Sequence, residues 1–366
     1  MSGPGLHIGV DGRELLGRPT GVGRYLAEIL GAWMADPTWP HRLTIFLPSS
    51  PGDELRARLP HVAWHVAAST STGTRWEQMR LPGAITRSGV DVFFAAGYTA
   101  PLRLACPFVV AIYDVSFFAH PEWFGWREGM RRRWITRSAA RRARRVVTIS
   151  EFSAREIVRW IGIRREAIAI APPGAPLLAD DADASPREPI VLFVGSLFNR
   201  RRIPDLIAAF AAAARDVPSA RLVLAGDNRT TPRIDPLALA STLGVGDRVE
   251  WRAYVSDAEL AELYDRARVF AFLSDYEGFA MTPMEALARG VAPVLLDTPV
   301  AREVYGDAAV FVPAQTTAIA AALRTLLIDD MARGRIVQAG RERLQAFSWP
   351  HAAATIRTAL EEAARP

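Results

Sequence analysis

Short apolar runs that alternate with longer helical stretches constrain the fold of this chain more than any other feature. The runs are LTIFLP (43–48), VDVFFAAG (90–97), FVVAIYD (108–114), RRVVTIS (144–150), PIVLFVGS (189–196), RLVLAGD (221–227), RVFAFLS (268–274) and VAPVLLD (291–297). In such patterns the apolar runs form parallel strands, and the intervening helices cover both faces of the sheet. The sequence therefore predicts an α/β protein with doubly wound sheets.

Chain length favours two domains, because a single hydrophobic core stops growing at roughly 250 to 300 residues and this chain has 366. The small, acidic, proline-containing stretch LLADDADASPRE divides it almost evenly. We therefore expect a first domain over 1–178, a linker over 179–188 and a second domain over 189–347. Ser348, Trp349 and Pro350 then open a final helix within 348–366, which we expect to cross back onto the first domain.

The basic residues exclude some chemistry, since all 44 are arginine. Without lysine the chain cannot form a Schiff base with pyridoxal phosphate, and it cannot supply the lysine of a phosphate-binding P-loop. A single cysteine, Cys106, excludes an internal disulfide framework and a cysteine-based zinc cluster. We expect it to be a small core residue at the start of a buried strand.

No apolar run approaches the roughly 20 residues of a membrane span, and the N-terminus does not resemble a secretory signal. A cytoplasmic protein is expected.

Three helix starts carry the pattern of a capping box, a hydroxyl residue followed three positions later by glutamate. The pairs are Ser153 with Glu156, Ser256 with Glu259, and Thr282 with Glu285.

The strongest local signal is SDYEGFAMTPMEALARG (274–290). We expect a strand to end at Ser274, a loop to hold Glu277, and a helix to begin at Pro283 and contain Glu285. Ligands of α/β domains bind at the carboxyl ends of strands, where a helix N-terminus also attracts anionic groups. Both carboxylates are therefore placed to accept hydrogen bonds from the hydroxyls of a nucleotide sugar. The alternatives are a helix cap for Glu285 and a solvated loop carboxylate for Glu277.

The segment EGFAMTPME (277–285) resembles the Glu-x7-Glu signature of the retaining glycosyltransferases of family 4, which have the GT-B fold. The similarity extends over 243–279 upstream and 290–313 downstream, and in the first half over VDGRELLGRPTGVGRYLAEIL (10–30), VVAIYDVSFFAHPEWF (109–124), VVTISEFSAREI (146–157) and IAIAPPG (168–174). It implies two Rossmann-like domains that face each other across a cleft, an acceptor-binding one first and a nucleotide-sugar-binding one second.

The resemblance also implies roles for single residues. Glu285 is expected to bind the ribose hydroxyls of the donor, and Glu277 the transferred sugar. Arg200 and Arg201 take the place of the family's cationic pair on the diphosphate, with Arg202 to spare, although a basic loop after a strand would explain their charge alone. The remaining donor-binding positions are Gly195, Ser196, Tyr254, Gly278, Phe279, Ala280, Met281 and Thr282.

In the first half, Thr20-Gly21-Val22-Gly23 lies between an expected strand and helix. The resemblance places Gly21 and Gly23 near the diphosphate of the donor, because glycine allows close backbone approach to phosphate. A third glycine of the dinucleotide-binding fingerprint is missing, which disfavours a Rossmann oxidoreductase.

One departure from the family concerns the residues after FVVAI, where Tyr113 and Asp114 stand and a histidine is usual. Tyrosine titrates near pH 10 and cannot replace the charge of a histidine at neutral pH. Tyr113 and Asp114 complete the expected catalytic set with Glu277, Arg200 and Arg201. For Asp114 a strand-end cap is the alternative.

The resemblance implies a retaining hexosyltransferase that needs neither metal nor cofactor, because two arginines can stabilise the leaving diphosphate. His61 and His65 lie in a stretch that reads as a strand, so no zinc site is assigned. GDP-mannose is the first donor expected and a UDP-sugar the second, with a saccharide or lipid-linked acceptor in polysaccharide or glycolipid assembly. A nucleotide-sugar epimerase and a non-catalytic sugar-nucleotide binder are the alternatives.

Residues 127–145 hold nine arginines and one glutamate on an expected helix that includes Trp134, and Trp123, Phe124 and Trp126 lie just upstream. Arginines beside tryptophans suit the anionic inner face of the plasma membrane, and hence peripheral attachment. A solvated basic helix is the alternative. No nucleic-acid-binding module accompanies the patch, so nucleic acid is not an expected partner.

Overall fold

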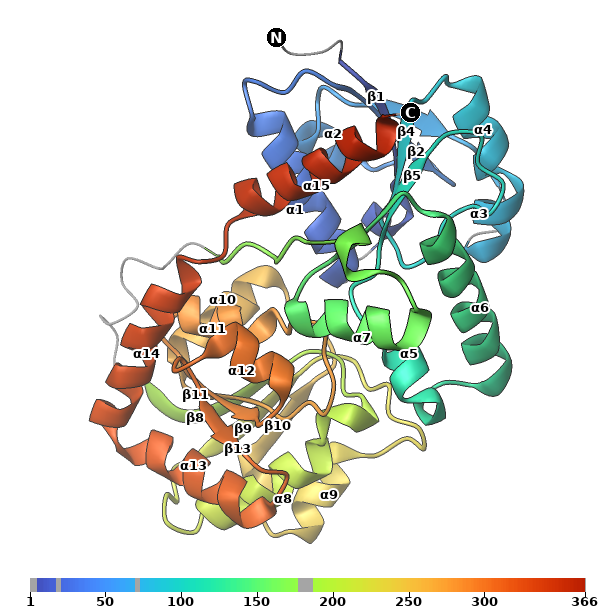
Figure 1. Ribbon diagram of the computed structural model, residues 1–366. Coiled ribbons are helices and arrows are strands. Elements are labelled where there is room, and N and C mark those ends of the chain that lie inside the picture. The colour runs from blue at the N-terminus through green and yellow to red at the C-terminus, as the bar shows by residue number, and fades with distance from the viewer. Residues whose placement is uncertain (1–4, 18–20, 70–72, 177–186, 366) are drawn as a thin grey trace. The chain divides into compact units, whose positions relative to one another are not determined.

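The computed structural model describes residues 5–17, 21–69, 73–176 and 187–365, which form two compact units (Figure 1). Within these residues the first unit comprises the chain up to Gly174 together with Ser348 onward, and the second runs from Ala175 to Phe347. Most of the expected linker, 179–186, lies outside the described residues, whereas Glu188 already belongs to a strand.

The first unit is a seven-stranded parallel sheet in the order β3-β2-β1-β4-β5-β6-β7, with helices between the strands. Its strands are β1 (His7–Asp11), β2 (Arg42–Leu47), β3 (Ala63–Val66), β4 (Val92–Ala95), β5 (Phe108–Ala111), β6 (Arg145–Thr148) and β7 (Ile168–Ile170). Its helices are α1 (Gly21–Ala35), α2 (Asp53–Arg58), α3 (Thr74–Met79), α4 (Leu81–Arg87), α5 (Ser116–Ala119), α6 (Trp126–Arg142), α7 (Glu151–Ile161) and α15 (Trp349–Ala364).

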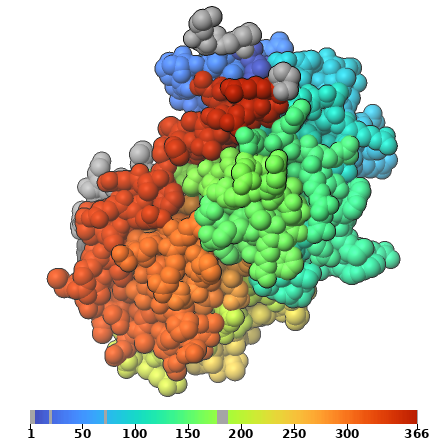
Figure 2. All heavy atoms as spheres, viewed as in Figure 1, coloured from blue at the N-terminus to red at the C-terminus, as the bar shows by residue number. Residues whose placement is uncertain are grey.

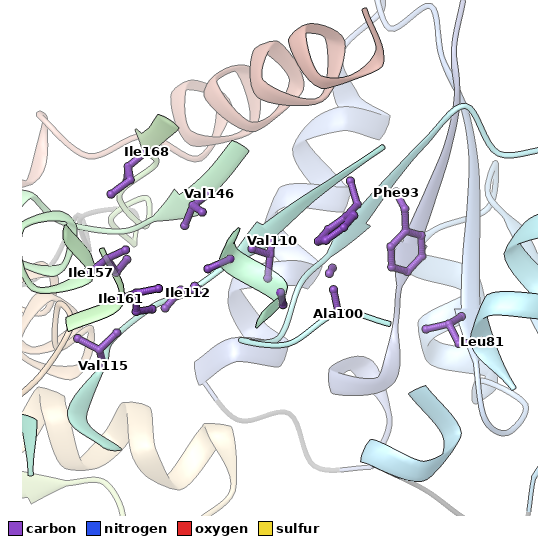
Figure 3. Packing of buried hydrophobic residues seen from close by; sticks show 14 of the residues in the cluster. Leu81, Phe93, Ala100, Val110, Ile112, Val115, Val146, Ile157, Ile161 and Ile168 are labelled. Carbon is purple, nitrogen blue, oxygen red and sulfur yellow. The ribbon is translucent and has the colours of Figure 1, made fainter. Parts of the chain in front are cut away.

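Continuous burial of the central strands explains why they read as unbroken apolar runs. Every residue of β1, β4 and β5 is buried. Figure 3 shows the resulting core, in which Phe93 of β4, Val110 of β5 and Val146 of β6 pack together with Ile157 of α7. A sheet covered on both faces needs strands that are apolar on both faces.

The second unit is a six-stranded parallel sheet in the order β10-β9-β8-β11-β12-β13. Its strands are β8 (Glu188–Val194), β9 (Arg221–Ala225), β10 (Val249–Arg252), β11 (Ala267–Phe272), β12 (Ala292–Leu296) and β13 (Val310–Val312). Its helices are α8 (Ile203–Ala213), α9 (Pro236–Thr242), α10 (Asp257–Arg266), α11 (Thr282–Ala288), α12 (Pro299–Tyr305), α13 (Thr316–Ile328) and α14 (Asp330–Leu344).

The expected fold class is confirmed, because both sheets are parallel and each of the eight apolar runs overlaps a strand. None of the described helices combines the length and apolarity that crossing a membrane requires.

The final helix, α15, belongs to the first unit, as expected. Its N-cap is Ser348, whose hydroxyl accepts a hydrogen bond from the amide of His351. The Trp33 indole of α1 donates to the Ala353 carbonyl at 2.9 Å, and Trp349 meets Tyr25 edge to face with ring centres 5.6 Å apart. In Figure 2 the red C-terminal residues accordingly lie against blue N-terminal ones.

Of the three expected capping boxes, the structure shows the one between Ser256 and Glu259. The pairing of Ser153 with Glu156 was wrong, because Ser150 caps α7 and the Ser153 hydroxyl donates instead to the Tyr113 carbonyl at 2.9 Å. Thr282 is also not an N-cap, because it is already the first helical residue of α11.

Candidate active site

The candidate donor site lies at the crossover of the second sheet. From β8 the chain passes to β9 and β10 on one side, and it returns to β11 on the other side. The loops after β8 and β11 therefore diverge, and ligands of open parallel sheets bind in the crevice that forms there. These two loops carry the arginines and the glutamate that the sequence indicates.

After β8 the chain turns at Gly195 and forms a 3-10 turn, Asn199–Arg201. Gly195 has a φ of +134°, and a Cβ atom there would lie 2.4 Å from Nη1 of Arg201. The same Nη1 donates to the Ser196 carbonyl at 2.9 Å. A side chain at Gly195 would therefore displace the guanidinium from its place.

Glu277 joins the two loops. Its Oε1 accepts hydrogen bonds from the Ser274 hydroxyl at 2.9 Å and from Nε of Arg201 at 3.2 Å, and Nε of Arg200 is 3.7 Å away. The Glu277 side chain is only 16% exposed. The structure thus brings Glu277, Arg200 and Arg201 together, and Glu277 is not the solvated loop carboxylate of the alternative interpretation.

Two guanidinium groups face one carboxylate here, which leaves a positive charge for an anionic ligand. Burial lowers the pKa of Arg201, and the negative charge of the adjacent Glu277 opposes that decrease. The Arg201 guanidinium carbon lies 4.9 Å from the centre of the Phe272 ring. Arg200 stacks on Phe198 at 4.5 Å, and its buried Nε has no hydrogen-bond partner among the described residues.

Arg202 is not a spare cation, because two carboxylates already hold it. Its Nε donates to Asp275 at 2.7 Å and its Nη1 to Asp205 at 2.9 Å. These contacts hold Arg202 at the start of α8.

Glu285 lies in the first turn of α11, where its Oε2 accepts a hydrogen bond from the Tyr264 hydroxyl at 3.1 Å. Tyr264 is a buried residue of α10. The carboxylate is thus oriented from a neighbouring helix, and the capping-box interpretation does not describe it.

The loop between the two glutamates has a fixed and strained backbone. Ala280 has a φ of +67°, which is costly for a residue with a Cβ atom. The buried Tyr305 hydroxyl donates to its carbonyl, and the neighbouring Phe279 packs edge to face on Phe347 at 5.3 Å. Strained backbone of this kind clusters at ligand sites, where it preorganises the loop.

Other expected donor-binding residues differ in their surroundings. Gly278 is buried, whereas Met281 and Thr282 are half-buried. Tyr254 lies between β10 and α10 with 64% of its surface exposed.

In the first unit, Gly21 and Gly23 form the first turn of α1, where the sequence predicted a loop. Thr20 lies outside the described residues. A helix N-terminus offers free amides to an anion. If this segment binds phosphate, the groups that do so are therefore the amides at the start of this fifteen-residue helix and not those of a glycine loop.

Tyr113 is a core residue. Its hydroxyl donates to the Ala96 carbonyl at 2.7 Å, and its ring meets Tyr25 and Tyr98 edge to face. Burial raises its pKa well above the usual range. The hydroxyl therefore stays protonated and is already used inside the first unit.

Asp114 accepts two hydrogen bonds at the end of β5. Its Oδ1 binds the amide of Ser116 at 2.8 Å, as in a strand-end cap, and its Oδ2 accepts from the Tyr98 hydroxyl at 2.8 Å.

The part of the chain that the structure describes contains no group of three or more His, Cys, Asp or Glu side chains arranged to hold a metal ion. His65 lies in β3 and His61 just before it.

Two contributors to the site did not emerge from the sequence, namely Ser274 and Tyr264. Ser274 lies in the loop, because β11 ends at Phe272 and not at Ser274 as expected. A hydroxyl three positions before a glutamate is the only local signal for its bond to Glu277. Tyr264 comes from another helix, so only the tertiary structure reveals its contact with Glu285.

Two family models match most of the chain. The model described as Glycosyltransferase Family 4 matches residues 19–177, and the one described as Glycosyl transferases group 1 matches residues 179–343.

Related proteins and structures agree with these matches. O-antigen chain mannosyltransferase B of Escherichia coli is 27% identical over 292 residues, which is 70% of this chain and 71% of the relative. MMP alpha-(1->4)-mannosyltransferase of Mycolicibacterium hassiacum is 28% identical over 251 residues, 65% of this chain and 60% of the relative. Anabaena Alr3699/HepE, solved in complex with UDP and glucose, has a similar fold, with a TM-score of 0.75 at 18% identity over 97% of this chain and 99% of that one. The chain is therefore a glycosyltransferase that belongs to glycosyltransferase family 4.

Proposed function

We propose that this enzyme transfers a hexose, with retention of anomeric configuration, from a nucleotide diphosphate to a saccharide or lipid-linked acceptor in polysaccharide or glycolipid assembly. Mannose from GDP-mannose is the first choice, supported by the two mannosyltransferase relatives, and a UDP-sugar is the second, supported by the UDP complex of similar fold. The observation that carries the proposal is the cluster of Glu277, Arg200 and Arg201 at the carboxyl ends of β8 and β11.

Each group in the proposed donor site has a distinct task. Glu285, oriented by Tyr264, accepts hydrogen bonds from the ribose hydroxyls, and Glu277 accepts them from the transferred sugar. Arg200 and Arg201 bind the diphosphate, whose negative charge grows as the glycosidic bond breaks, and preorganised cations stabilise that charge without a metal. Gly21 and Gly23, at the start of α1, are proposed as further ligands of the diphosphate.

The proposed reaction is a front-face substitution. The acceptor oxygen forms its bond to the anomeric carbon on the side from which the diphosphate leaves, and the acceptor proton passes to the departing phosphate oxygen. Tyr113 and Asp114 serve as positioning residues, because their polar atoms hold Ala96 and Tyr98 in the first unit. That unit is the proposed acceptor-binding domain.

Thermal shift with GDP-, UDP-, ADP- and TDP-sugars, each with and without EDTA, tests the donor assignment. GDP-mannose should raise the Tm by the largest amount, and EDTA should not change that rise. Stabilisation by none of the sugars would contradict donor binding, whereas an EDTA-sensitive shift would contradict metal independence. Release of an epimerised nucleotide sugar without acceptor would favour the epimerase.

We also propose that the exposed face of α6 contacts anionic lipid at the inner face of the plasma membrane. Trp126, Met130 and Trp134 are 70%, 48% and 63% exposed and lie one turn apart on the same face. A groove of about 550 Å³ beside them is lined by Arg133, Arg137 and Arg141 together with apolar side chains. Exposed tryptophans between arginines suit the boundary between headgroups and acyl chains.

Not all of the aromatic residues singled out in the sequence take part in this face. Trp123 stacks on His120 at 4.0 Å, and Phe124 packs against the core. Arg132 also turns inward, where it lies over aromatic rings.

Vesicle sedimentation tests the membrane contact. The protein should bind phosphatidylcholine vesicles that contain phosphatidylglycerol, and a Trp126→Ser/Trp134→Ser double variant should bind at least tenfold more weakly. Met331→Ser, which changes a residue that is equally exposed in the second unit, serves as control. Equal binding of all three proteins, or binding to duplex DNA alone, would contradict the proposal.

A further inference from the structure

The first sheet has its own crossover, between β1 and β4, and a cavity of about 410 Å³ opens there. It is lined by Arg13 and Glu14 after β1, Tyr98 and Thr99 after β4, and Arg131 and Arg132 of α6. The size falls within the roughly 300 to 1,000 Å³ of small-ligand sites, and the position is the one at which open parallel sheets bind ligands.

Two of the lining residues, Arg13 and Thr99, belong to a buried ionic network. Nη2 of Arg13 lies 2.8 Å from Asp11 and 2.8 Å from Glu77, and both carboxylates are buried. The Thr99 hydroxyl donates to Glu77 at 2.6 Å. Because two carboxylates already satisfy Arg13, this arginine is not available to a further anion.

Two charged groups on the cavity wall have no such partner. Among the described residues, the Glu14 carboxylate makes no hydrogen bond and no ion pair within 4.0 Å, and the Arg132 guanidinium has no acidic partner within that distance. The two side chains attract each other only at longer range. Instead, Arg132 is held over the rings of Tyr98 at 4.9 Å and Phe117 at 4.7 Å. Burial raises the pKa of Glu14, and Arg13 opposes this. Half-buried polar groups without partners, aimed at a cavity, are available to a ligand.

The position of Tyr98 fixes this arrangement. Its φ is +64°, and its amide donates to the Ala111 carbonyl at 2.8 Å while its hydroxyl donates to Asp114 at 2.8 Å. These bonds hold a strained backbone in place, which in turn holds the ring under Arg132. The wall is therefore preorganised.

The balance of charge decides which class of ligand suits the cavity. Glu14 and Glu128 are the carboxylates that line it, and Arg13, Arg131 and Arg132 are the guanidinium groups. The charge of Arg13 is already compensated by its two buried carboxylate partners. Two acidic and two basic groups then remain on the wall, so a phosphate would meet no net positive charge. A sugar hydroxyl, in contrast, can donate to a carboxylate and accept from a guanidinium at the same time.

We propose that this cavity binds an uncharged sugar ring of the acceptor, with Glu14 and Arg132 as the specificity-determining pair that contacts its hydroxyls. The assignment of the ring to the acceptor rests on the proposed transferase function. Val22, between the two glycines proposed to approach the diphosphate, lines the same cavity, which places the ring next to that part of the first unit.

Saturation-transfer NMR with the full-length protein, with and without GDP, tests this site. The probes are the methyl glycosides of mannose, glucose, galactose and N-acetylglucosamine, and mannose 6-phosphate as the anionic comparison. At least one methyl glycoside should bind, and mannose 6-phosphate should bind at least tenfold more weakly. Glu14→Gln and Arg132→Met should each weaken the glycoside at least tenfold, whereas Arg142→Met, an exposed position on the same helix, should not.

Calorimetry with GDP distinguishes sugar binding in the cavity from donor binding, because Arg200, Arg201 and Glu285, the side chains proposed to bind the nucleotide, lie in the second unit. Both cavity variants should bind GDP as the wild type does, which also shows that they are folded. Failure of every methyl glycoside to bind, preference for mannose 6-phosphate, or unchanged glycoside binding in both variants would overturn the inference. Failure of the wild type to bind GDP would instead overturn GDP-mannose as the donor and leave the cavity result standing.

Discussion

The buried charge of Arg201 is stabilised by neighbouring side chains of the second unit. Its guanidinium is buried, so it needs a carboxylate nearby, and Glu277 is that carboxylate at 3.2 Å. Removing one partner of a buried ion pair is costly, because the other charge is left without compensation. The proposed diphosphate is a second anion that can supply that compensation.

Glu277→Gln should therefore lower the free energy of unfolding by about 1 to 3 kcal/mol, the cost of an incompletely satisfied buried charge. GDP should raise the Tm of this variant more than that of the wild type, because the diphosphate replaces the missing negative charge beside Arg200 and Arg201. Thermal shift with increasing GDP measures both effects. Equal stabilisation of the two proteins would mean that the arginines do not contact the diphosphate.

Cys106 illustrates the effect of burial on a single thiol. It is half-buried against the core of the first unit, and burial raises its pKa to about 11. At pH 8 only about one thiol in a thousand is then ionised, and the thiolate is the reactive form.

The rate at which Cys106 reacts with iodoacetamide should therefore keep rising about tenfold per pH unit from pH 7.5 to 9.5. An ordinary thiol, with a pKa near 8.5, would level off within that range. A plateau below pH 9.5 in the folded protein would contradict the burial effect.

At the scale of elements, the sequence predicted the strands well, because buried parallel strands must be apolar on both faces. It was less successful at helix starts. Ser150 and Ser153 are both hydroxyl residues near the start of α7, and only the folded chain shows that Ser153 is engaged by Tyr113. Likewise, Thr282 and Glu285 have the spacing of a capping box, yet Glu285 is oriented by α10.

The loops after β8 and β9 touch backbone to backbone at Gly226. Its φ is +146°, and a Cβ atom there would lie 2.1 Å from the Gly195 carbonyl oxygen. Gly226→Ala should destabilise the protein by about 2 kcal/mol or more and displace Gly195 beneath Arg201. Gly334→Ala, in the open middle of α14, should instead stabilise by about 0.5 to 1 kcal/mol. Urea unfolding measures both, and equal effects would contradict the close contact.

At the scale of the whole molecule, each unit has its own core, and the last helix returns to the first. Ile356 of α15 is fully buried in the first unit, and Ile319 of α13 is fully buried in the second. The chain therefore contains two hydrophobic cores that single substitutions can address separately.

Ile356→Ala should remove about 2 to 5 kcal/mol of stability from the first unit. Hydrogen exchange followed by mass spectrometry should then show faster exchange in peptides from β1 to β7 and little change in β8 to β13. Ile319→Ala should show the reverse pattern. Faster exchange in both sheets for either variant would contradict the division.

The sequence predicted the candidate donor site more fully than the cavity of the first unit, because the donor-site residues are close together in the sequence and the cavity residues are not. Glu277 and Glu285 lie on one short segment, and the arginines are consecutive, so local pattern reveals them. Glu14 and Arg132 are far apart in sequence and meet only because β1 and α6 fold together. For Tyr113 the sequence position suggested a site residue, whereas the structure shows a core residue whose hydroxyl donates to the Ala96 carbonyl.

Glu285 is proposed to bind the ribose of the donor and Glu277 the transferred sugar. Calorimetry of GDP-mannose with the wild type, Glu285→Ala and Glu277→Ala, together with the turnover of each protein, tests these two roles most directly. Glu285→Ala should raise the Kd at least tenfold, about 1.4 kcal/mol, because the ribose contact is lost. Glu277→Ala should bind GDP-mannose within threefold of the wild type, because the lost sugar contact offsets the stronger attraction between the arginines and the diphosphate, but it should transfer no sugar. Full transfer activity in Glu277→Ala, or unchanged affinity in Glu285→Ala, would contradict the assignment.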